Sequence, residues 1–362
     1  MNIRQFSQDE FSALKHQWQD LLLRSDADSL FLSWDWMYSW WQVWAQDDFE
    51  LLLLGAYNGD QLVGIAPLYS KTAPSKLLIN SRYIEFIGTS STSHFGFRTE
   101  YLEFLADRSC AAEAVQSLFN WIANEATFDE MRLNDIVKGS ATHRCALGFA
   151  EYGHYIRLQE ASQTYGIDTH DAFDSYVKRL GKNSRLKVFN RRKVLEDLGD
   201  VTLETIHQSN FGEVLDHLSE FHLRRWGRHI SYKNHRNFID LLCNDSDKSV
   251  SGIIIRLDGK LLGCTFDVDC GNTCYNFQLG FADNVDKKIS MGSLTIGYAA
   301  ERCFNNPHLE YYDLLAGEGK HSNYKNRIAT AGKQFESLQI VSSPLFKSLY
   351  RIKDILQDLR ST

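Results

Sequence analysis

Two β-hairpin patterns, separated by about 200 residues, limit the folds open to this chain more than any other feature of the sequence. The first covers Leu51 to Leu68 and turns at Asn58-Gly59, and the second covers Ile253 to Phe266 and turns at Asp258-Gly259. In both, apolar β-formers flank an Asn-Gly or Asp-Gly pair, which is the strongest short-range signal for a hairpin. The spacing indicates either a duplicated domain or two unrelated hairpins, because hairpins of this kind are frequent.

The segments around the two hairpins follow the same order, which favours the duplication. A glycine follows each turn, Gly64 in the first hairpin and Gly263 in the second. The expected helices are 10–24, 34–44, 111–124, 141–152, 213–225 and 294–304, and the further expected strands are 83–86, 101–104, 131–136, 201–205, 273–281, 311–315 and 334–341. Because strands and helices alternate after each hairpin, the sequence predicts an α/β fold with a mixed sheet in each half.

A small-residue turn before the helix expected at 294–304 is the strongest candidate for a ligand site. A polar loop, Asp286–Ser290, leads into Met291-Gly292-Ser293, and the strand after the helix is closed by Gly317. The start of a helix leaves backbone N–H groups without intrahelical acceptors, and the helix dipole places positive charge there. Such a turn suits a pyrophosphate, although an ordinary helix cap explains the same residues.

A basic segment, Lys178 to Lys193, lies between the two halves. Its basic residues, with no acidic residue among them, are Lys178, Arg179, Lys182, Arg185, Lys187, Arg191, Arg192 and Lys193. Apolar residues at Leu186, Phe189 and Leu195 indicate a helix with one buried side. This concentration of positive charge suggests a phosphate-rich ligand, and the alternative is a solvated helix face.

The overall composition excludes several classes of protein. With 362 residues, 43% hydrophobic and 23% charged, the chain is typical of two globular domains. A net charge of −7 argues against coating of nucleic acid. The first residues do not resemble a signal peptide, and the apolar runs fall short of the roughly 20 residues that span a bilayer, so we expect a cytoplasmic protein. The seven cysteines and twelve histidines show no metal-ligand spacing, which favours free buried thiols and no metal.

An amphipathic helix is expected at the end of the sequence, from Pro344 to Leu359. Its apolar face is formed by Leu345, Leu349, Ile352, Ile355, Leu356 and Leu359. We expect this face to dock on the body of the protein, and peripheral membrane contact is the second interpretation.

Several short motifs, taken in order, resemble a known family. They are Phe31-x-x-Trp34 with Trp40, Gly64-Ile65-Ala66-Pro67-Leu68, Arg191-Arg192-x-x-Leu195-Glu196-x-x-Gly199, Arg225-Trp226, the Asp258-Gly259 hairpin, Gly292, Tyr312-Asp313-Leu314-Leu315-x-Gly317, and Tyr324-Lys325. The chain is similar in these motifs to the CelD-like acetyltransferases associated with cellulose biosynthesis, a tandem-GNAT group related to the FemAB peptidyltransferases. It departs from them at Met291, where family members usually have proline.

The resemblance implies a domain organisation. It places a degenerate GNAT-like domain at 1–160, a connecting basic helical segment at 161–200, an acyl-CoA-binding GNAT-like domain at 201–342 and a C-terminal amphipathic helix at 343–362. Because no comparable glycine turn precedes Ala111, acyl-CoA is expected in the second half.

The resemblance also implies roles for particular residues in acyl transfer from a thioester to an amine or hydroxyl. The catalytic candidates are Asp313 as base or substrate anchor, Tyr324 as the acid for the thiolate, and His222 as a second base. The cofactor-binding candidates, for acetyl-CoA or another acyl-CoA, are Lys287, Lys288, Met291, Gly292, Ser293 and Leu294. The substrate-binding candidates are Arg191, Arg192, Arg225, Trp226 and Lys325. Each of these residues also has an ordinary structural explanation, as a solvated lysine, a packed aromatic or a paired charge.

Three functional classes follow from these observations. The first is an acyl-CoA-dependent N- or O-acyltransferase acting on a sugar or a cell-surface polysaccharide precursor, with a small-molecule, lipid-linked or nucleotide-linked sugar as the acceptor. That acceptor is expected in a cleft between the halves. The second is a FemAB-like enzyme that uses aminoacyl-tRNA, in which the basic segment would contact RNA phosphates. The third is a non-catalytic binding protein with a GNAT fold. No DNA partner is expected.

Overall fold

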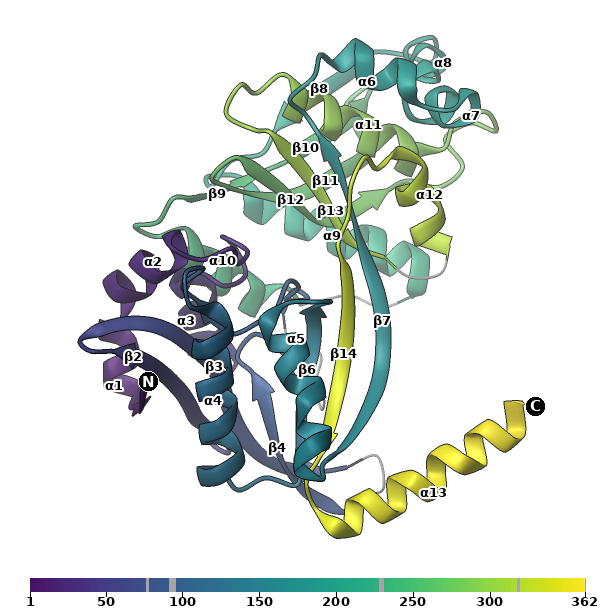
Figure 1. Cartoon of the computed structure of the whole chain (residues 1–362). Coiled ribbons are helices and arrows are strands. Elements are labelled where there is room, and N and C mark those ends of the chain that lie inside the picture. The colour runs from purple at the N-terminus through teal and green to yellow at the C-terminus, as the bar shows by residue number, and fades with distance from the viewer. Residues whose placement is uncertain (76–77, 91–95, 228–230, 318–319, 362) are drawn as a thin grey trace. The chain divides into compact units, whose positions relative to one another are not determined.

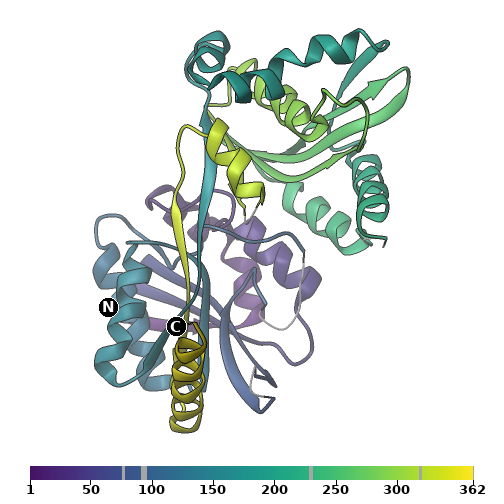
Figure 2. The ribbon, with the colours of Figure 1, turned by 90° about the vertical axis from the view of Figure 1, so that its right-hand side faces the viewer.

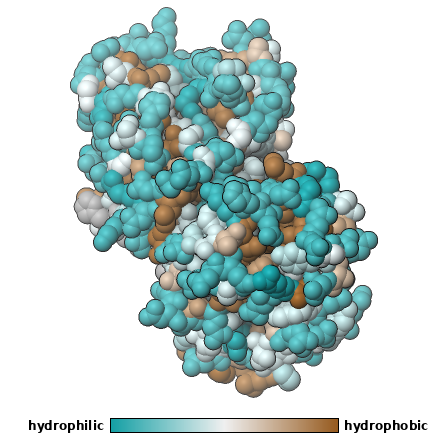
Figure 3. Space-filling view, turned by 90° about the vertical axis from the view of Figure 1, so that its left-hand side faces the viewer, coloured by the Kyte–Doolittle hydropathy of each residue, from teal (hydrophilic) through white to brown (hydrophobic). Residues whose placement is uncertain are grey.

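The computed structural model describes residues 1–75, 78–90, 96–227, 231–317 and 320–361, and it divides into two compact units (Figure 1). Unit 1 consists of residues 1–162 and 334–362, and unit 2 consists of residues 163–333. Each unit is built on its own twisted sheet with helices on both faces, as a second view also shows (Figure 2). The surface drawn in Figure 3 is largely hydrophilic, with hydrophobic residues in scattered patches.

Unit 1 contains the first hairpin. Its elements are β1 (Asn2–Phe6), α1 (Gln8–Ala13), α2 (Lys15–Leu23), α3 (Trp34–Trp44), β2 (Glu50–Asn58), β3 (Gln61–Pro74), β4 (Asn80–Phe86), β5 (Leu105–Ala106), α4 (Ala111–Glu125), β6 (Glu130–Val137), α5 (Ala141–Gly148), the 3-10 turn η1 (Phe149–Tyr152), the start of β7 (Tyr155–Asp168), β14 (Gln334–Val341) and α13 (Pro344–Ser361). The strand order is β1-β2-β3-β4-β6-β14-β7, and β5 pairs with β3.

Unit 2 contains the second hairpin. Its elements, after the end of β7, are α6 (Phe173–Arg179), α7 (Lys182–Arg185), the π-helical turn η2 (Leu186–Asn190), α8 (Arg192–Glu196), β8 (Val201–Thr205), α9 (Phe211–Trp226), α10 (Lys233–Cys243), β9 (Lys248–Ser251), β10 (Ile253–Leu257), β11 (Lys260–Cys270), β12 (Thr273–Phe281), α11 (Met291–Phe304), β13 (Tyr311–Ala316) and α12 (Lys320–Ile328). The strand order is β7-β13-β12-β11-β10-β8, and β9 pairs with β11.

The two glycines that follow the hairpin turns have the same structural function in the two units. A Cβ on Gly64 of β3 would lie 3.2 Å from the Cβ of Ala114 on α4, and a Cβ on Gly263 of β11 would lie 2.4 Å from Oγ1 of Thr295 on α11. In each unit the glycine therefore lets a helix pack directly on the second strand of the hairpin. Together with the matching strand order, this packing confirms the predicted α/β tandem fold.

Two strands, β14 and β7, join the sheets in a way that the sequence did not suggest. β14 pairs antiparallel with β6 of unit 1, with Ile340 opposite Met131. The end of β7 pairs antiparallel with β13 of unit 2, with Ile167 opposite Tyr312. Residues 334–341 were expected in the second domain, but their backbone hydrogen bonds complete the first sheet. Residues 163–200, expected mainly as a connecting segment, belong to unit 2.

Several local expectations also differ from the structure. The basic segment is a series of short helices, α6, α7, η2 and α8, rather than one helix, although Phe189 and Leu195 are buried as predicted. Segment 101–104 is not a strand, since Leu102 makes an isolated bridge to Ile136 and Tyr101 has a φ of 55°. The strands β1, β7 and β9 and the helices α10 and α12 had no distinct signal in the sequence.

Helix α11 forms the centre of the core of unit 2. Its buried residues are Met291, Gly292, Leu294, Thr295, Ile296, Gly297, Tyr298, Ala299, Ala300 and Cys303. Gly297 brings the helix against η2, because a Cβ at this position would lie 2.1 Å from the carbonyl oxygen of Val188. The contact involves backbone and therefore cannot be relieved by a side-chain rotation.

We expect Gly297→Ala to destabilise the protein by about 1–3 kcal/mol, because overpacking at this contact forces η2 away from α11. Thermal unfolding followed by circular dichroism measures the effect. The matched control is Gly148→Ala at the end of α5, where a Cβ meets no atom within 4 Å. The control should leave the stability equal or slightly higher. Equal melting temperatures for the two variants would contradict the close contact between α11 and η2.

Candidate active site

The central feature of unit 2 is a pair of parallel strands that separate. β12 and β13 pair at three positions, from Thr273 opposite Tyr311 to Tyr275 opposite Asp313. β12 then continues to Phe281 and β13 to Ala316 without further pairing between them. β12 beyond Tyr275 is therefore not paired with β13, and a ligand that presents amide donors and acceptors can bind along that edge.

A β-bulge lies where the strands begin to separate. On the other side of β12, Asp267 of β11 pairs with Asn276, and Phe266 pairs with Gln278. Phe277 is thus the extra residue of the bulge on β12. Bulges redirect backbone groups out of the ladder and are frequent next to active sites.

A pocket of about 400 Å³ lies at the start of α11 and is formed entirely by unit 2. It is lined by Asn183, Ser184, Lys187 and Val188 from α7 and η2, Leu279 and Phe281 from β12, Ser290, Gly292 and Ser293 at the start of α11, and Tyr324, Arg327 and Ile328 from α12. The apolar side chains come from β12, η2 and α12, and the polar groups come from the helix start and from two basic residues. Pockets that combine apolar walls with a few polar groups are typical ligand sites.

The polar side of the pocket suits phosphate. Ser290 precedes α11 but makes no side-chain cap, and its Oγ lies 2.9 Å from Oγ of Ser293. The first N–H groups of α11 therefore keep their donor capacity. Lys187 and Arg327 add two exposed cations. In the part of the chain that the structure describes, neither side chain makes an ion pair or hydrogen bond with the protein.

Gly292 lines this pocket, and the structure shows a packing reason for the glycine as well. A Cβ at Gly292 would lie 2.7 Å from the ring of Phe281. The glycine therefore lets the ring pack against the first turn of α11. Met291 and Leu294 point into the core, at 4% and 0% exposure, so only their backbone could face a ligand. Met291-Gly292-Ser293 is the first turn of the helix itself rather than a turn before it.

The two loop lysines expected near the phosphates do not line the pocket. Lys287 and Lys288 are both exposed, in the loop between β12 and α11. The Lys288 N–H donates to the Asp286 carboxylate at 2.7 Å, which forms a local turn. The basic residues that do line the pocket, Lys187 and Arg327, were missed as site residues. Lys187 was one of eight cations in its segment, and no sequence pattern distinguished its direction from that of the others.

Tyr324 and Lys325 are neighbours on α12 with different surroundings. The Tyr324 side chain lines the pocket, and burial raises the pKa of its phenol to about 12. It is therefore protonated at neutral pH and able to donate a proton. Lys325 Nζ instead donates to the carbonyl oxygens of Leu314 and Ala316, at 2.6 and 2.9 Å. This contact ties α12 to the end of β13, so the ammonium is engaged with the backbone rather than open to a substrate.

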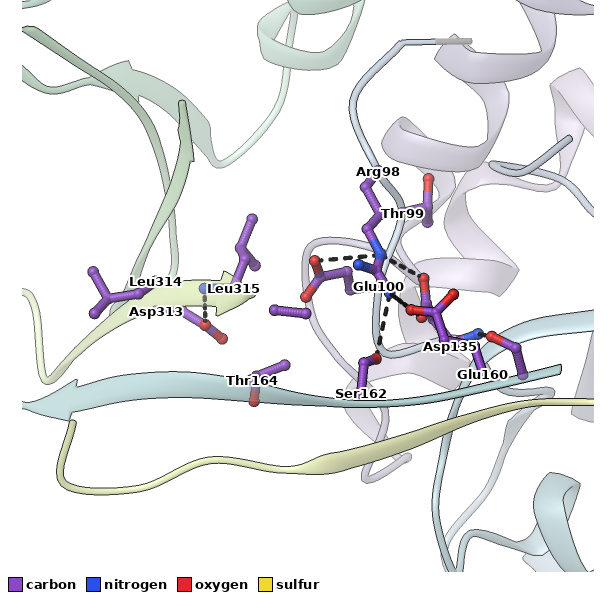
Figure 4. A network of polar contacts seen from close by, with 12 residues as sticks. Arg98, Thr99, Glu100, Asp135, Glu160, Ser162, Thr164, Asp313, Leu314 and Leu315 are labelled. Carbon is purple, nitrogen blue, oxygen red and sulfur yellow. Dashed lines mark hydrogen bonds and ion pairs between the residues drawn. The ribbon is translucent and has the colours of Figure 1, made fainter. Parts of the chain in front are cut away.

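Asp313 and His222 lie away from the pocket. Asp313 is buried in β13, and its carboxylate accepts a hydrogen bond from the Leu315 N–H at 2.7 Å (Figure 4). Leu315 has a φ of 58°, so this bond holds a distorted end of the strand. Neighbouring Tyr312 and Leu314 join the α11 core, which places Asp313 on the opposite face of the sheet. His222 is on α9, which packs on that opposite face of the sheet. A Cβ on Gly280 would meet Phe221 of α9, whereas a Cβ on Gly263 would meet Thr295 of α11.

The arginines proposed for substrate binding have separate environments. Arg192 forms an ion pair with Glu301 and lies over the Tyr298 ring at 3.9 Å, so its guanidinium holds α8 against α11. Arg191 is half-buried at the start of α8 and does not line the pocket. The side chains of Arg225 and Trp226, at the end of α9, lie outside the described residues. The substrate-binding roles of these four residues stay predictions.

In unit 1, the equivalent gap is filled by the chain itself. β4 and β6 pair in parallel at only three positions, as β12 and β13 do. Beyond them, the Leu102 N–H donates to the Asp135 carbonyl at 3.1 Å, and Arg98 binds the Asp135 carboxylate at 2.6 and 2.8 Å (Figure 4). Residues 98–102 therefore occupy the edge of β6. This gives a physical reason to expect a ligand in unit 2 rather than in unit 1.

Comparisons with known proteins agree with this geometry. Residues 182–326 match the family model described as acetyltransferase (GNAT) domain, a range that contains every pocket residue except Arg327 and Ile328. The chain has no significant match among curated proteins. The match to the GNAT acetyltransferase domain indicates that the protein is an acyltransferase enzyme.

Solved structures show the same tandem fold at low sequence identity. FemX is similar over 97% of this chain and 99% of its own, with a TM-score of 0.60 and 11% identity. A tandem GNAT protein from the clavulanic acid biosynthesis pathway is similar over 95% and 99%, with a TM-score of 0.54 and 13% identity. The C-terminal domain of a putative lysylphosphatidylglycerol synthetase from Agrobacterium fabrum is similar over 92% and 93%, with a TM-score of 0.52 and 9% identity. At these identities the likeness establishes the fold.

The described residues contain neither a membrane-crossing helix nor a candidate metal centre. No helix among them is both long and apolar enough to span a bilayer. No group of three or more histidine, cysteine or acidic residues among them could hold a metal ion. All seven cysteines are free thiols, and Cys264, Cys270, Cys274 and Cys303 are buried.

Proposed function

We propose that the protein transfers an acyl group from an acyl-CoA, bound in unit 2, to an amine or hydroxyl of a sugar or polysaccharide precursor. The observation that carries the proposal is the pocket at the start of α11, where helix N–H groups, Lys187 and Arg327 surround one cavity beside the separating strands. An acyl-CoA combines a pyrophosphate with an extended pantetheine arm. The pyrophosphate fits a helix start with two cations, and the pantetheine arm fits the edge of β12 that does not pair with β13.

The proposed reaction uses groups of unit 2. The acceptor nitrogen or oxygen attacks the thioester carbonyl carbon and passes its proton to water, and the carbon–sulfur bond breaks to release the CoA thiolate. Backbone N–H groups of β12, along the part that does not pair with β13, are the candidates for stabilising the oxyanion of the tetrahedral intermediate. Tyr324, whose phenol lines the pocket and is protonated at neutral pH, donates a proton to the leaving thiolate and regains one from water.

The pocket-lining side chains include no group that suits removal of the acceptor proton. Apart from Tyr324, the titratable residues of the lining are Lys187 and Arg327, and both suit phosphate better than proton abstraction. An acceptor amine that binds in its neutral form needs no strong base. Asp313 and His222 lie away from the pocket, and their proposed roles as bases depend on the position of an acceptor.

Calorimetric titration with acetyl-CoA and longer acyl-CoAs tests the donor. We expect saturable binding with one site per chain, and weaker binding of pantetheine thioesters that lack the nucleotide and its phosphates. Binding of aminoacyl-tRNA without acyl-CoA binding, steeply weakened by salt, would select the FemAB-like alternative. Absence of binding to either donor would select a non-catalytic protein with this fold.

The acceptor is tested separately by following release of the CoA thiol. A panel of amino sugars, nucleotide-linked sugars and lipid-linked sugars is incubated with the enzyme and acetyl-CoA, and free thiol is titrated with a disulfide reagent. Thiol release that requires one member of the panel, with the acylated sugar found by mass spectrometry, supports the proposed acceptor class. Release that depends instead on amino acids or peptides would overturn the sugar assignment and retain the acyltransferase.

A further inference from the structure

Helix α13 attaches to unit 1 by one side only. Phe346 and Tyr350 are buried against the unit, and the Tyr350 hydroxyl donates to the buried Glu130 carboxylate at 3.2 Å. Further along, Asp354 accepts hydrogen bonds from Tyr155 at 2.8 Å and from Arg157 Nε at 2.7 Å. Figure 1 shows the helix leaving the end of β14 and extending away from the sheet of unit 1.

The apolar face that was expected to dock on the body is exposed. Its exposed residues are Leu345, Ile352, Ile355, Leu356 and Leu359, which are 51–69% exposed. The expectation of docking was wrong because the contacts are made by the neighbouring stripe of Phe346, Tyr350 and Asp354. Successive residues rotate by about 100° around a helix, so the five exposed residues form one continuous apolar side.

The charges of the helix beside that apolar side are mainly basic. The charged residues of the helix whose side chains the structure describes are Lys347, Arg351, Lys353 and Asp354. Asp354 is already bound to Arg157, and this hydrogen bond lowers the pKa of its carboxyl. The charge left to the exterior is positive, in a chain whose net charge is −7. A basic helix in an acidic protein concentrates attraction for an anionic surface at one place.

We propose that α13 lies in the interface of an anionic lipid bilayer, with its exposed apolar side inserted among the acyl chains. The arrangement of an apolar side flanked by basic residues is what binding in the plane of such a membrane requires. A second copy of the chain fits less well, because pairing of the apolar sides would bring the same basic residues against one another. The helix would hold the enzyme at a membrane surface, where lipid-linked acceptors are found.

Co-sedimentation of the full chain with vesicles tests this inference. Vesicles of phosphatidylcholine mixed with phosphatidylglycerol should bind the protein, and vesicles of phosphatidylcholine alone should bind it much more weakly. The double variant Ile352→Ser with Leu356→Ser should bind the mixed vesicles at least about tenfold more weakly. Replacing Arg351 and Lys353 with glutamine should weaken binding about fivefold for each charge removed, and added salt should have the same direction of effect.

A surface leucine of the same unit provides the control. Leu147 on α5 is 43% exposed, and Leu147→Ser should leave vesicle binding unchanged. Circular dichroism of all variants verifies the fold. The variants with glutamine at 351 and 353 test the electrostatic part of vesicle binding separately from the apolar part. Failure of the wild-type chain to sediment with the mixed vesicles would overturn the proposal. So would sedimentation equilibrium that shows a dimer abolished by Ile352→Ser with Leu356→Ser, which would assign the face to a second copy. Neither result would affect acyl-CoA binding in unit 2.

Discussion

Replacing Tyr324 with phenylalanine is expected to lower kcat for acyl transfer by about 100-fold, because the leaving thiolate loses its proton donor. The phenol lines the pocket, and its pKa is raised to about 12, so it is protonated across the physiological range. Phenylalanine keeps the ring and removes only the hydroxyl. The Kd for acetyl-CoA, measured by calorimetry, should therefore change by less than about twofold. Rates are measured as acceptor-dependent release of the CoA thiol.

A second tyrosine in unit 2 serves as the matched control for that experiment. The Tyr232 hydroxyl donates to Gln278 at 2.7 Å and does not line the pocket. Tyr232→Phe removes the same atom and one hydrogen bond, so it should affect stability by about 1 kcal/mol and leave kcat nearly unchanged. Equal kcat for wild type and Tyr324→Phe would exclude Tyr324 as the acid, and a loss of acetyl-CoA binding would make it a packing residue of the donor site.

Local patterns predicted the parts of this fold that are held by local interactions. The second hairpin formed at Asp258-Gly259 because both residues have positive φ, 49° and 77°, as a tight two-residue turn requires. No comparable pattern in the sequence predicted that β14 joins the sheet of unit 1 and that the end of β7 joins the sheet of unit 2. β7 and β14 pair with strands that are far away in the sequence. The residue pattern of a strand does not indicate which of two sheets the strand joins.

Sequence patterns indicated part of the lining of the candidate pocket at the start of α11. The small residue before an apolar helix indicated Gly292 and Ser293, and both line the pocket. The pattern could not show that Gly292 also accommodates the Phe281 ring, since that contact depends on how β12 meets α11. Nor could it show that Lys325 binds the end of β13 while Tyr324, one residue earlier, faces the pocket. Adjacent helical residues differ in direction by about 100°, and the sequence does not state which direction faces the ligand.

The difference between the two units has a partial signal in the sequence that became clear only with the structure. In unit 2 a short segment, 282–290, joins β12 to α11, whereas in unit 1 the corresponding segment, 87–110, is longer. Part of it, from Arg98 to Leu102, lies along β6 and fills the place that is open in unit 2. The greater length of segment 87–110 indicated extra structure between β4 and α4. The position of that structure follows from contacts such as Arg98 with Asp135, which no spacing rule predicts.

Reversal of the charges at Lys187 and Arg327 is expected to weaken acyl-CoA binding by about tenfold for each residue, since an exposed charge-assisted bond to phosphate contributes about 1.5 kcal/mol. Both side chains line the pocket without an ion pair or hydrogen bond to the protein in the described part of the chain. The changes Lys187→Glu and Arg327→Glu should therefore leave the fold intact, and calorimetry with acetyl-CoA gives the two Kd values. The double variant should lose about 100-fold if the two cations act independently on the phosphates.

Lys193→Glu is the matched control, because it makes the same change of charge in the same basic segment, at an exposed position outside the pocket. A purely general attraction of the basic segment for phosphate would weaken binding equally in Lys193→Glu and Lys187→Glu, and the effect would disappear at high salt. A specific phosphate site predicts a large loss only at Lys187 and Arg327. The comparison also separates the donor from the acceptor. Loss of acetyl-CoA affinity assigns these cations to the donor, whereas an unchanged Kd with a raised KM for the acceptor would move the acceptor to this pocket and overturn the proposed binding of acyl-CoA.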